Sequence, residues 1–256
     1  MDLFSSFILS AVEGFTEFLP ISSTAHLWLT AKLLGLPNSD FMKTFGISIQ
    51  SGAILAVLAL YWRKLLDYRI LKKLFTAFLP TGILGLIFYK TIKTHFIGND
   101  LINLSALAAG GVFLILFEKL HQEKDEIKEV ESISYKNSFL IGLFQSVAMI
   151  PGVSRAAATI VGGLFLKIRR ATIVEFSFLL AVPTMLAATG FELVKNLDSL
   201  SSSQFGTVGI GFVLSFVMAL SGIKFLLSYI KTRTFTGFGV YRIILAAVFA
   251  LLFYLK

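Results

Sequence analysis

Cysteine is absent from this chain of 256 residues, and charged residues make up only 15% of it. The absence of cysteine excludes disulfides and thiolate chemistry. Soluble domains average about 25% charged residues, so this composition excludes an ordinary soluble domain. The N-terminus also lacks the basic segment of a cleaved signal peptide, since Asp2 stands there and Glu13 and Glu17 interrupt the first apolar run.

Hydrophobic residues account for 56% of the chain, and the mean hydropathy is +0.82. Six apolar runs reach or approach the roughly 20 residues that span a bilayer, at about 41–62, 74–89, 101–117, 175–194, 206–230 and 240–255. The chain is therefore expected to be an all-α integral membrane protein with about six transmembrane helices. The net charge of +8 comes from basic residues between these runs, which indicates membrane topology rather than binding to nucleic acid.

Two further apolar segments, 1–36 and 137–166, are broken in the middle by Pro20 and by Pro151-Gly152. Non-helical backbone at membrane depth survives only inside protein or beside a water-filled cavity. Each segment is therefore predicted to be a re-entrant pair of half-helices that enters and leaves the membrane on one side.

The two broken segments indicate an internal repeat in a single membrane domain, 1–256. A constant shift of 131 residues aligns Pro20 with Pro151 and Ser23 with Ser154, and it also aligns Phe45 with Phe176 and Ala56 with Ala187. The first repeat would be 1–117, the second 137–256, and a charged linker, 118–136, would join them. Each repeat has three spans, so the second would be inverted, which places a site near the midplane where the copies meet.

Basic residues predict the orientation, because cytoplasmic loops carry an excess of Lys and Arg. One predicted side holds most of them: Arg63, Lys64, Arg69, Lys72, Lys73, the linker, Lys167, Arg169, Arg170, Lys231 and Arg233. The other side holds little beyond Lys32, Lys43, Lys90, Lys93, Lys195 and Lys256. The richer side, with the linker as a solvated connector, is expected to be cytoplasmic, which puts both termini outside.

Ionisable residues inside a membrane usually line a polar cavity. Glu13 and Glu17 lie four residues apart and would share one helix face. Such a pair either shares a proton, holds a cation or supports the bend. Magnesium prefers one or two carboxylates together with phosphate oxygens, which favours a metal site at Glu13 and Glu17.

After Pro20, the run Ser22-Ser23-Thr24 is typical of a helix N-cap, with His26 about one turn further on. Helix N-termini favour phosphate. In the second segment, Gly152 permits close backbone approach, Ser154 is the expected cap, and Arg155 offers a guanidinium fork or a salt bridge to a glutamate. Two opposed helix N-termini of this kind would suit a pyrophosphate. Polar residues in apolar surroundings, Gln50 and Gln145, could support the glutamates or bond between helices.

The first segment, Glu13-Gly-Phe-Thr-Glu17-Phe-Leu-Pro-Ile-Ser-Ser-Thr-Ala-His26, resembles the first signature of the bacterial undecaprenyl-pyrophosphate phosphatase (bacitracin-resistance) family. Pro151-Gly-Val-Ser154-Arg155, with Thr159, resembles its second signature. Similarity also covers Phe45 to Ala56 and Phe176 to Pro183, so the resemblance spans nearly the whole chain. The sequence departs from the family at Gly46, where an acidic residue is usual, and at Ala156-Ala157, where a serine-glycine pair is usual.

The resemblance implies six spans with two re-entrant pairs in the bacterial cytoplasmic membrane, and a homodimer is left open. It implies hydrolysis of undecaprenyl pyrophosphate on the outer face, with Mg²⁺ or Ca²⁺ as cofactor. This reaction recycles the lipid carrier of peptidoglycan synthesis and confers bacitracin resistance. A polyprenyl-phosphate transporter and an inactive lipid-binding homologue are the alternatives.

Within this hypothesis, Glu17, Ser23, His26 and Arg155 are the catalytic residues. Ser23 is the expected nucleophile and His26 its proton-transferring partner, although an attacking water or His26 itself would give the same pattern. Arg155 and helix N–H groups would stabilise the transferring phosphoryl group. The substrate would be bound by Ser22, Thr24, Gln50, Gly152, Ser154 and Thr159.

Overall fold

A computed structural model describes residues 1–37, 39–96, 98–122, 126–195 and 204–254, without the side chains of 192–195 and 254. Helices account for nearly all of it, and these residues form no strand beyond an isolated bridge between Ile127 and Ile168. Ten α-helices follow in order: α1 Leu3–Thr16, α2 Ser23–Leu33, α3 Asp40–Leu65, α4 Tyr68–Thr91, α5 Asp100–Leu120, α6 Tyr135–Ser146, α7 Arg155–Phe165, α8 Arg170–Lys195, α9 Phe205–Tyr229 and α10 Thr236–Tyr254. Short η elements are Ile92–Phe96, Val130–Ser132 and Val147–Met149.

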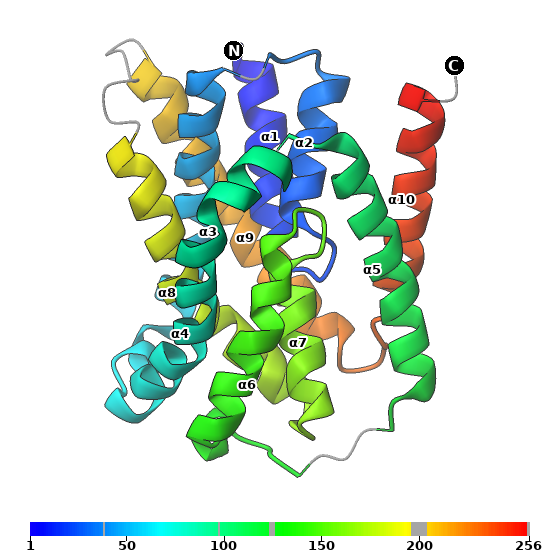
Figure 1. The fold of residues 1–256 in the computed structure, drawn as a ribbon. Coiled ribbons are helices and arrows are strands. Elements are labelled where there is room, and N and C mark those ends of the chain that lie inside the picture. Colours follow the sequence, from blue (N-terminus) through cyan, green and yellow to red (C-terminus); the bar gives the residue numbers. More distant parts are fainter. Residues whose placement is uncertain (38, 97, 123–125, 196–203, 255–256) are drawn as a thin grey trace.

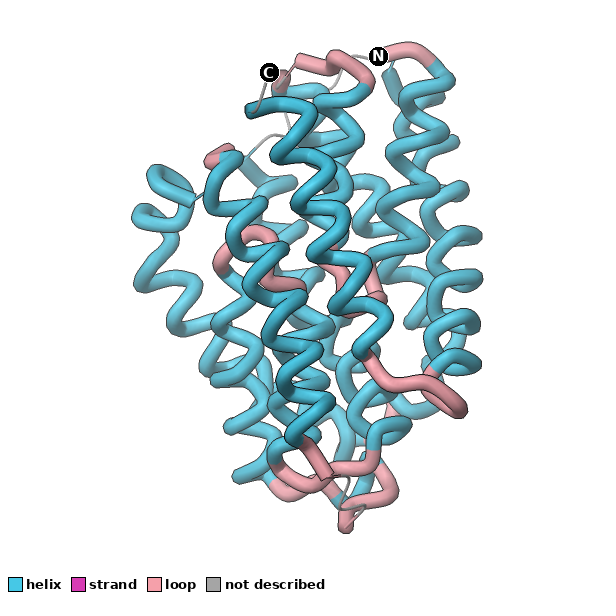
Figure 2. Tube along the Cα trace, turned by 90° about the vertical axis from the view of Figure 1, so that its right-hand side faces the viewer, coloured by secondary structure: helices cyan, strands magenta, loops and turns pink. Residues whose placement is uncertain are grey.

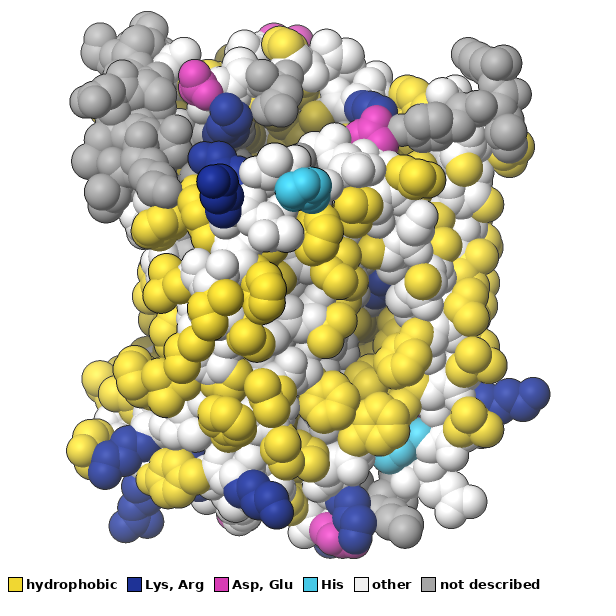
Figure 3. Space-filling view, viewed as in Figure 1, with side chains coloured by type: hydrophobic (Ala, Val, Ile, Leu, Met, Phe, Trp, Pro, Cys, Tyr) yellow, Lys and Arg dark blue, Asp and Glu magenta, His cyan; other side chains and the backbone are white. Residues whose placement is uncertain are grey.

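Six of these helices are long and apolar enough to cross a membrane: α3, α4 with the following turn, α5, α8, α9 and α10. They match the six predicted runs, so the prediction of an all-α membrane protein is confirmed. Hydrophobic side chains cover the middle of the face in Figure 3, and Lys and Arg gather toward its two ends. That distribution is expected of a protein whose middle is surrounded by lipid.

The other four helices form two short pairs. In Figure 1, α1 runs inward from the end that carries both termini and α2 returns to it, whereas α6 and α7 do the same from the opposite end. Loops therefore lie at mid-height inside the bundle as well as at its ends (Figure 2). This is the geometry expected of two half-helix pairs, and the loops 17–22 and 147–154 are called the tips below.

Each short pair packs against a long helix of the other half of the chain. Helix α1 lies along α9, and α6 lies along α4. Small residues allow this close approach: a Cβ atom at Gly14 would lie 2.2 Å from the Ser215 carbonyl oxygen, and one at Gly142 would lie 1.9 Å from that of Ala77. The order of elements in the two halves is the one that an internal repeat predicts, although the repeat boundaries stay a prediction.

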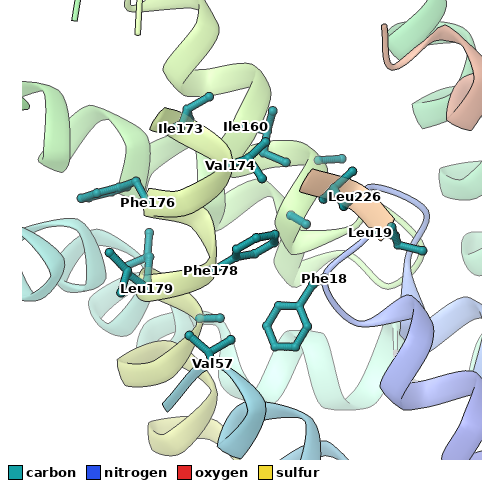
Figure 4. Packing of buried hydrophobic residues seen from close by; sticks show 14 of the residues in the cluster. Phe18, Leu19, Val57, Ile160, Ile173, Val174, Phe176, Phe178, Leu179 and Leu226 are labelled. Carbon is teal, nitrogen blue, oxygen red and sulfur yellow. The ribbon is translucent and has the colours of Figure 1, made fainter. Parts of the chain in front are cut away.

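The main hydrophobic core surrounds the first tip. Phe18, which is fully buried, packs edge-on against Phe178 of α8 with ring centroids 5.6 Å apart (Figure 4). Side chains of α3, α7 and α9 complete the cluster, among them Val57, Ile160 and Leu226. In a membrane such side chains stabilise the fold by close van der Waals packing, which holds the tip in place.

Basic residues of the described chain gather as predicted. The end that carries the linker also carries the junctions α3–α4, α7–α8 and α9–α10, where most of the Lys and Arg residues lie (Figure 1). On the other side, the side chain of Lys195 and all of Lys256 fall outside the described residues.

Candidate active site

The two tips meet in the middle of the bundle. Ser154 Oγ donates to the carbonyl oxygen of Leu19 at 3.5 Å, and Arg155 Nη2 donates to Glu17 Oε1 at 3.0 Å. The N-termini of α2 and α7 therefore face a common region, as two opposed half-helices require. Helix N-termini carry unpaired N–H groups and a positive end of the dipole, so this region attracts anions.

Both half-helices begin at a serine cap. Ser22 Oγ accepts from Ala25 N at 3.4 Å, and Ser154 Oγ accepts from Ala157 N at 3.2 Å. Both serines have a positive φ, 70° and 81°, which is rare for a residue with a side chain. The predicted caps are confirmed, but the two lie 132 residues apart. In the tips, Ser22 thus corresponds to Ser154, and Ser23 to Arg155, so the alignment of Ser23 with Ser154 is wrong by one residue.

The Glu17 carboxylate lies between these two corresponding residues. Ser23 Oγ donates to Glu17 Oε2 at 2.5 Å, while Arg155 Nη2 donates to the other oxygen. The glutamate side chain is 6% exposed and that of the arginine 13%. A hydroxyl that donates a short bond to a buried carboxylate is arranged to lose its proton, since this is how a base activates a weak nucleophile.

The Arg155 guanidinium is held by several groups. Nη1 donates to the Ser177 carbonyl oxygen at 2.9 Å, and the guanidinium lies 5.6 Å from the centre of the Phe18 ring. Its Nε is buried and has no hydrogen-bond partner. The salt bridge to a glutamate is therefore present, yet one N–H group stays free for a ligand.

A cavity of about 680 Å³ opens over this group. Its walls are largely apolar and come from α4 and α8, including Phe78, Ile83, Leu86, Ala187 and Phe191. Eight of the predicted site residues line it: Glu17, Ser22, Ser23, Thr24, Gln50, Gly152, Ser154 and Arg155. The cavity therefore combines a charged, hydrogen-bonding floor with a wall that suits a hydrocarbon.

Three predicted residues do not line this cavity. His26 Nδ1 bonds the Ser22 carbonyl oxygen at 2.8 Å, and its Nε2 bonds the Tyr241 hydroxyl at 2.8 Å. Both ring nitrogens are thus engaged away from Ser23. Thr159 is fully buried, and its hydroxyl donates to the Arg155 carbonyl oxygen at 2.8 Å. Glu13 lies one helical turn behind Glu17 and is 1% exposed.

The carboxylates allow a test of the predicted metal site. Among the described residues, no three His, Cys, Asp or Glu side chains gather to hold a metal ion. Both oxygens of Glu13, however, are buried without a hydrogen-bond partner. A hard divalent cation accepts one or two carboxylates when phosphate and water oxygens complete its shell, so Glu13 and Glu17 fit such an ion.

Arg242 of α10 is a buried residue that the sequence analysis missed. Its guanidinium is fully buried and donates only to backbone carbonyl oxygens, at 2.8–3.2 Å. These are Pro20 in the first tip, Gly152 and Val153 in the second, and Ala106 and Leu107 in α5. Arg242 therefore ties both tips to one another. A lone arginine in the apolar run 240–255 is the signal that could have revealed it.

The two departures from the family pattern lie in different surroundings. A Cβ atom at Gly46 would meet no atom within 4 Å, so a larger side chain has room there. Ala156 and Ala157 are buried in the first turn of α7, beside Arg155. The side chains that bond Glu17, those of Ser23 and Arg155, are both present.

Comparison with known proteins agrees with this architecture. The family model described as "Bacitracin resistance protein BacA" matches residues 6–248. A protein of Wolinella succinogenes named undecaprenyl-diphosphatase is 50% identical over all of this chain and 99% of its own length. Proteins with the same name from Aquifex aeolicus and Campylobacter jejuni are each 46% identical, over 96% and 99% of this chain and 96% of their own lengths.

The matches run through both tips, all six spans and the linker, so they cover the cavity as well as the scaffold around it. This chain belongs to the bacitracin resistance protein BacA family.

Proposed function

We propose that this protein hydrolyses undecaprenyl pyrophosphate to undecaprenyl phosphate and phosphate, which recycles the lipid carrier of peptidoglycan synthesis and confers resistance to bacitracin. Relatives up to 50% identical carry the name of this enzyme. The observation that carries the proposal is the Glu17 carboxylate held between the Ser23 hydroxyl and Arg155, at the floor of a cavity with apolar walls.

The two parts of the substrate match the two parts of the cavity. The pyrophosphate binds at the floor, where Arg155 Nε and the first N–H groups of α2 and α7 are available as donors. Thr24 and Gln50 lie on the same floor and add polar contacts. The prenyl chain follows the apolar wall between α4 and α8, because there it exchanges the hydrocarbon of the bilayer for side chains that are equally apolar.

Ser23 Oγ attacks the terminal phosphorus. A bond forms between this oxygen and phosphorus, the bond from phosphorus to the bridging oxygen breaks, and undecaprenyl phosphate leaves. The Ser23 proton passes to Glu17 Oε2, to which it is already hydrogen-bonded. Water then attacks the phosphoserine and the P–Oγ bond breaks. Glu17 returns its proton to Ser23 Oγ, and the water protons leave with the product as H₂PO₄⁻. Arg155 stabilises the charge that develops on the phosphoryl oxygens.

His26 and Thr159 have positioning rather than chemical roles in this proposal. The Nδ1–H group of His26 holds the carbonyl of Ser22, whose left-handed backbone starts α2. Thr159 holds the carbonyl of Arg155. These contacts hold the cap of α2 and the first residue of α7 where they meet the cavity.

A divalent cation, Mg²⁺ or Ca²⁺, would be held by Glu13 and Glu17 and would supply neutralising charge for the pyrophosphate. The protein would lie in the bacterial cytoplasmic membrane with its basic end inside, so that both termini are outside. The tips lie between these ends, and we place access for the substrate on the outer side. A homodimer stays a prediction.

The test is phosphate release from undecaprenyl pyrophosphate by the detergent-purified protein, with and without Mg²⁺. Glu17→Gln and Arg155→Lys should each lower the rate at least 100-fold, because each removes a contact to the reacting groups. Glu175→Gln is a matched control, since Glu175 is paired with Lys64 at 2.6 Å outside the cavity lining. A folded wild-type protein that releases no phosphate would contradict the proposed function, and full turnover by Ser23→Ala would contradict the serine route.

A further inference from the structure

The cavity contains a second polar group outside the Glu17 site. Thr81 of α4, Gln145 of α6 and Thr184 of α8 all line it. Gln145 Nε2 donates to Thr81 Oγ1 at 2.9 Å and to Thr184 Oγ1 at 3.2 Å. Three helices thus bring one amide and two hydroxyls together on an otherwise apolar wall.

The orientation of the Gln145 amide follows from the hydroxyl protons. Thr81 Oγ1 donates to the Gly142 carbonyl oxygen at 3.0 Å, and Thr184 Oγ1 donates to that of Leu180 at 2.8 Å. Each hydroxyl has one proton, so both oxygens are left only as acceptors and must face the NH₂ group. Gln145 Oε1 consequently points away from them.

Gln145 Oε1 has no hydrogen-bond partner, although Gln145 is only 1% exposed. A buried acceptor without a partner costs roughly 1–3 kcal/mol, so such atoms usually have a ligand. Of the unpaired buried side-chain atoms in the described chain, two belong to residues that line the cavity: Arg155 Nε, a donor, and Gln145 Oε1, an acceptor. The two atoms therefore suit different ligands: Arg155 Nε can bind an acceptor, and Gln145 Oε1 can bind a donor.

The partner of Gln145 Oε1 must be a hydrogen-bond donor, and water is a donor that the hydrolysis itself consumes. Phosphate oxygens that are ionised would be repelled by a carbonyl oxygen, whereas the free Arg155 N–H attracts them. Gln145 lines the same cavity as Ser23 and Arg155, and the two sides are linked through α8, where Thr184 bonds Gln145 Nε2 and the next residue, Met185, contacts Arg155 Nη2 at 3.5 Å. Both oxygens of Glu17 already accept bonds from Ser23 and Arg155.

We infer that Gln145 Oε1 binds and orients the water that hydrolyses the phosphoserine, which makes Gln145 a positioning residue in the second half of the reaction. This inference rests on the proposed function. The water donates one O–H to Gln145 Oε1, and its oxygen bonds to phosphorus as the P–Oγ bond breaks. Glu17 returns to Ser23 Oγ the proton that it took in the first half of the reaction, and both water protons leave with the product as H₂PO₄⁻. A glutamine that orients an attacking water is a known arrangement in phosphoryl transfer.

The test separates the two products in single-turnover and pre-steady-state reactions with undecaprenyl pyrophosphate. Gln145→Met keeps the length of the side chain and removes the acceptor. It should release about one undecaprenyl phosphate per protein in a rapid burst, while phosphate release slows at least tenfold and labelled phosphate accumulates on Ser23. Thr81→Val with Thr184→Val should have a similar but smaller effect, because it frees the amide to turn.

Thr76→Val is the matched control. Thr76 lies on α4 like Thr81, its hydroxyl bonds the Lys72 carbonyl oxygen at 2.8 Å, and it does not line the cavity. It should leave the ratio of the two release rates unchanged. Equal slowing of both products in Gln145→Met, or normal rates for both, would overturn the inference. Failure of the proposed function would look different, since the wild-type protein would then release neither product.

Discussion

Removal of the Arg242 contacts should loosen both tips at once. Three of the five carbonyls that it binds, those of Pro20, Gly152 and Val153, lie in the tips outside any helix ladder. An unsatisfied buried carbonyl costs roughly 1–3 kcal/mol, so Arg242→Met should cost about 3–9 kcal/mol. Total stabilities are about 5–15 kcal/mol, and this variant should therefore fold poorly or not at all.

Gly110→Ala gives a milder and more informative perturbation of the same group. A Cβ atom at Gly110 would lie 2.1 Å from Arg242 Nη2, so the guanidinium must move although its charge is kept. Such overpacking costs about 1–3 kcal/mol, which corresponds to a fall in Tm of about 2–4 °C per kcal/mol in a chain of this size. Phosphate release should fall at least tenfold, because displacement by about 1 Å can cost 100-fold in rate.

The assays are thermal unfolding in mild detergent and phosphate release from undecaprenyl pyrophosphate. Gly209→Ala is the control, since a Cβ atom there meets nothing within 4 Å. Its Tm should not fall, because alanine favours a helix more than glycine does. If Gly110→Ala matched Gly209→Ala in both Tm and rate, the role of Arg242 in holding the tips would be refuted.

Four further predictions concern other parts of the chain. Gly46→Ala should raise the free energy of unfolding by about 0.5–1 kcal/mol with unchanged turnover, because the site is open; a lower Tm would contradict this. Glu13→Gln should raise at least tenfold the Mg²⁺ concentration that gives half-maximal rate, and an unchanged titration would remove Glu13 from the metal site. Asn99→Ala should cost about 1 kcal/mol at the cap of α5 while kcat stays unchanged. Glu118→Gln should cost about 3–5 kcal/mol in thermal unfolding, because it removes the buried carboxylate charge to which both Arg170 and the backbone N–H of Phe235 donate.

Local sequence patterns predicted the spans and the starts of the half-helices, since both depend on residues close in the chain. Apolar runs of sufficient length specify the spans, and Ser22 and Ser154 cap helices through N–H groups only three residues on. The i,i+4 spacing likewise predicted that Glu17 lies one helical turn from Glu13, and the N–H of Glu17, the C-cap of α1, donates to the Glu13 carbonyl oxygen at 2.9 Å. The burial of Glu13 and Glu17 also follows from composition, because most residues around them in the segment 1–36 are apolar.

The contacts that the sequence does not predict involve partners that are distant in the chain. The spacing on α2 does not indicate the contacts of His26, whose Nε2 bonds the hydroxyl of Tyr241, 215 residues away. Arg242 bonds carbonyls from three separate segments, and a backbone oxygen has no side-chain signature to search for. The sequence shows Gln145 as a polar residue in apolar surroundings. That its Oε1 has no partner, however, depends on the backbone carbonyls to which the Thr81 and Thr184 hydroxyls donate. These contacts arise from tertiary structure, which spacing alone does not determine.

The correspondence between the halves explains why one site, rather than two, lies between the tips. A shift of 132 residues places Arg155 opposite Ser23, and both bond the same carboxylate. The same shift places Met149 opposite Glu17, so the second half has no carboxylate to offer there. The first half therefore supplies the base and the hydroxyl, and the second half supplies the cation. Because Glu17 must bond both Ser23 and Arg155, the reaction requires the two halves to keep their relative position. Arg242 of α10 maintains that position, since its guanidinium donates to backbone carbonyls in both tips.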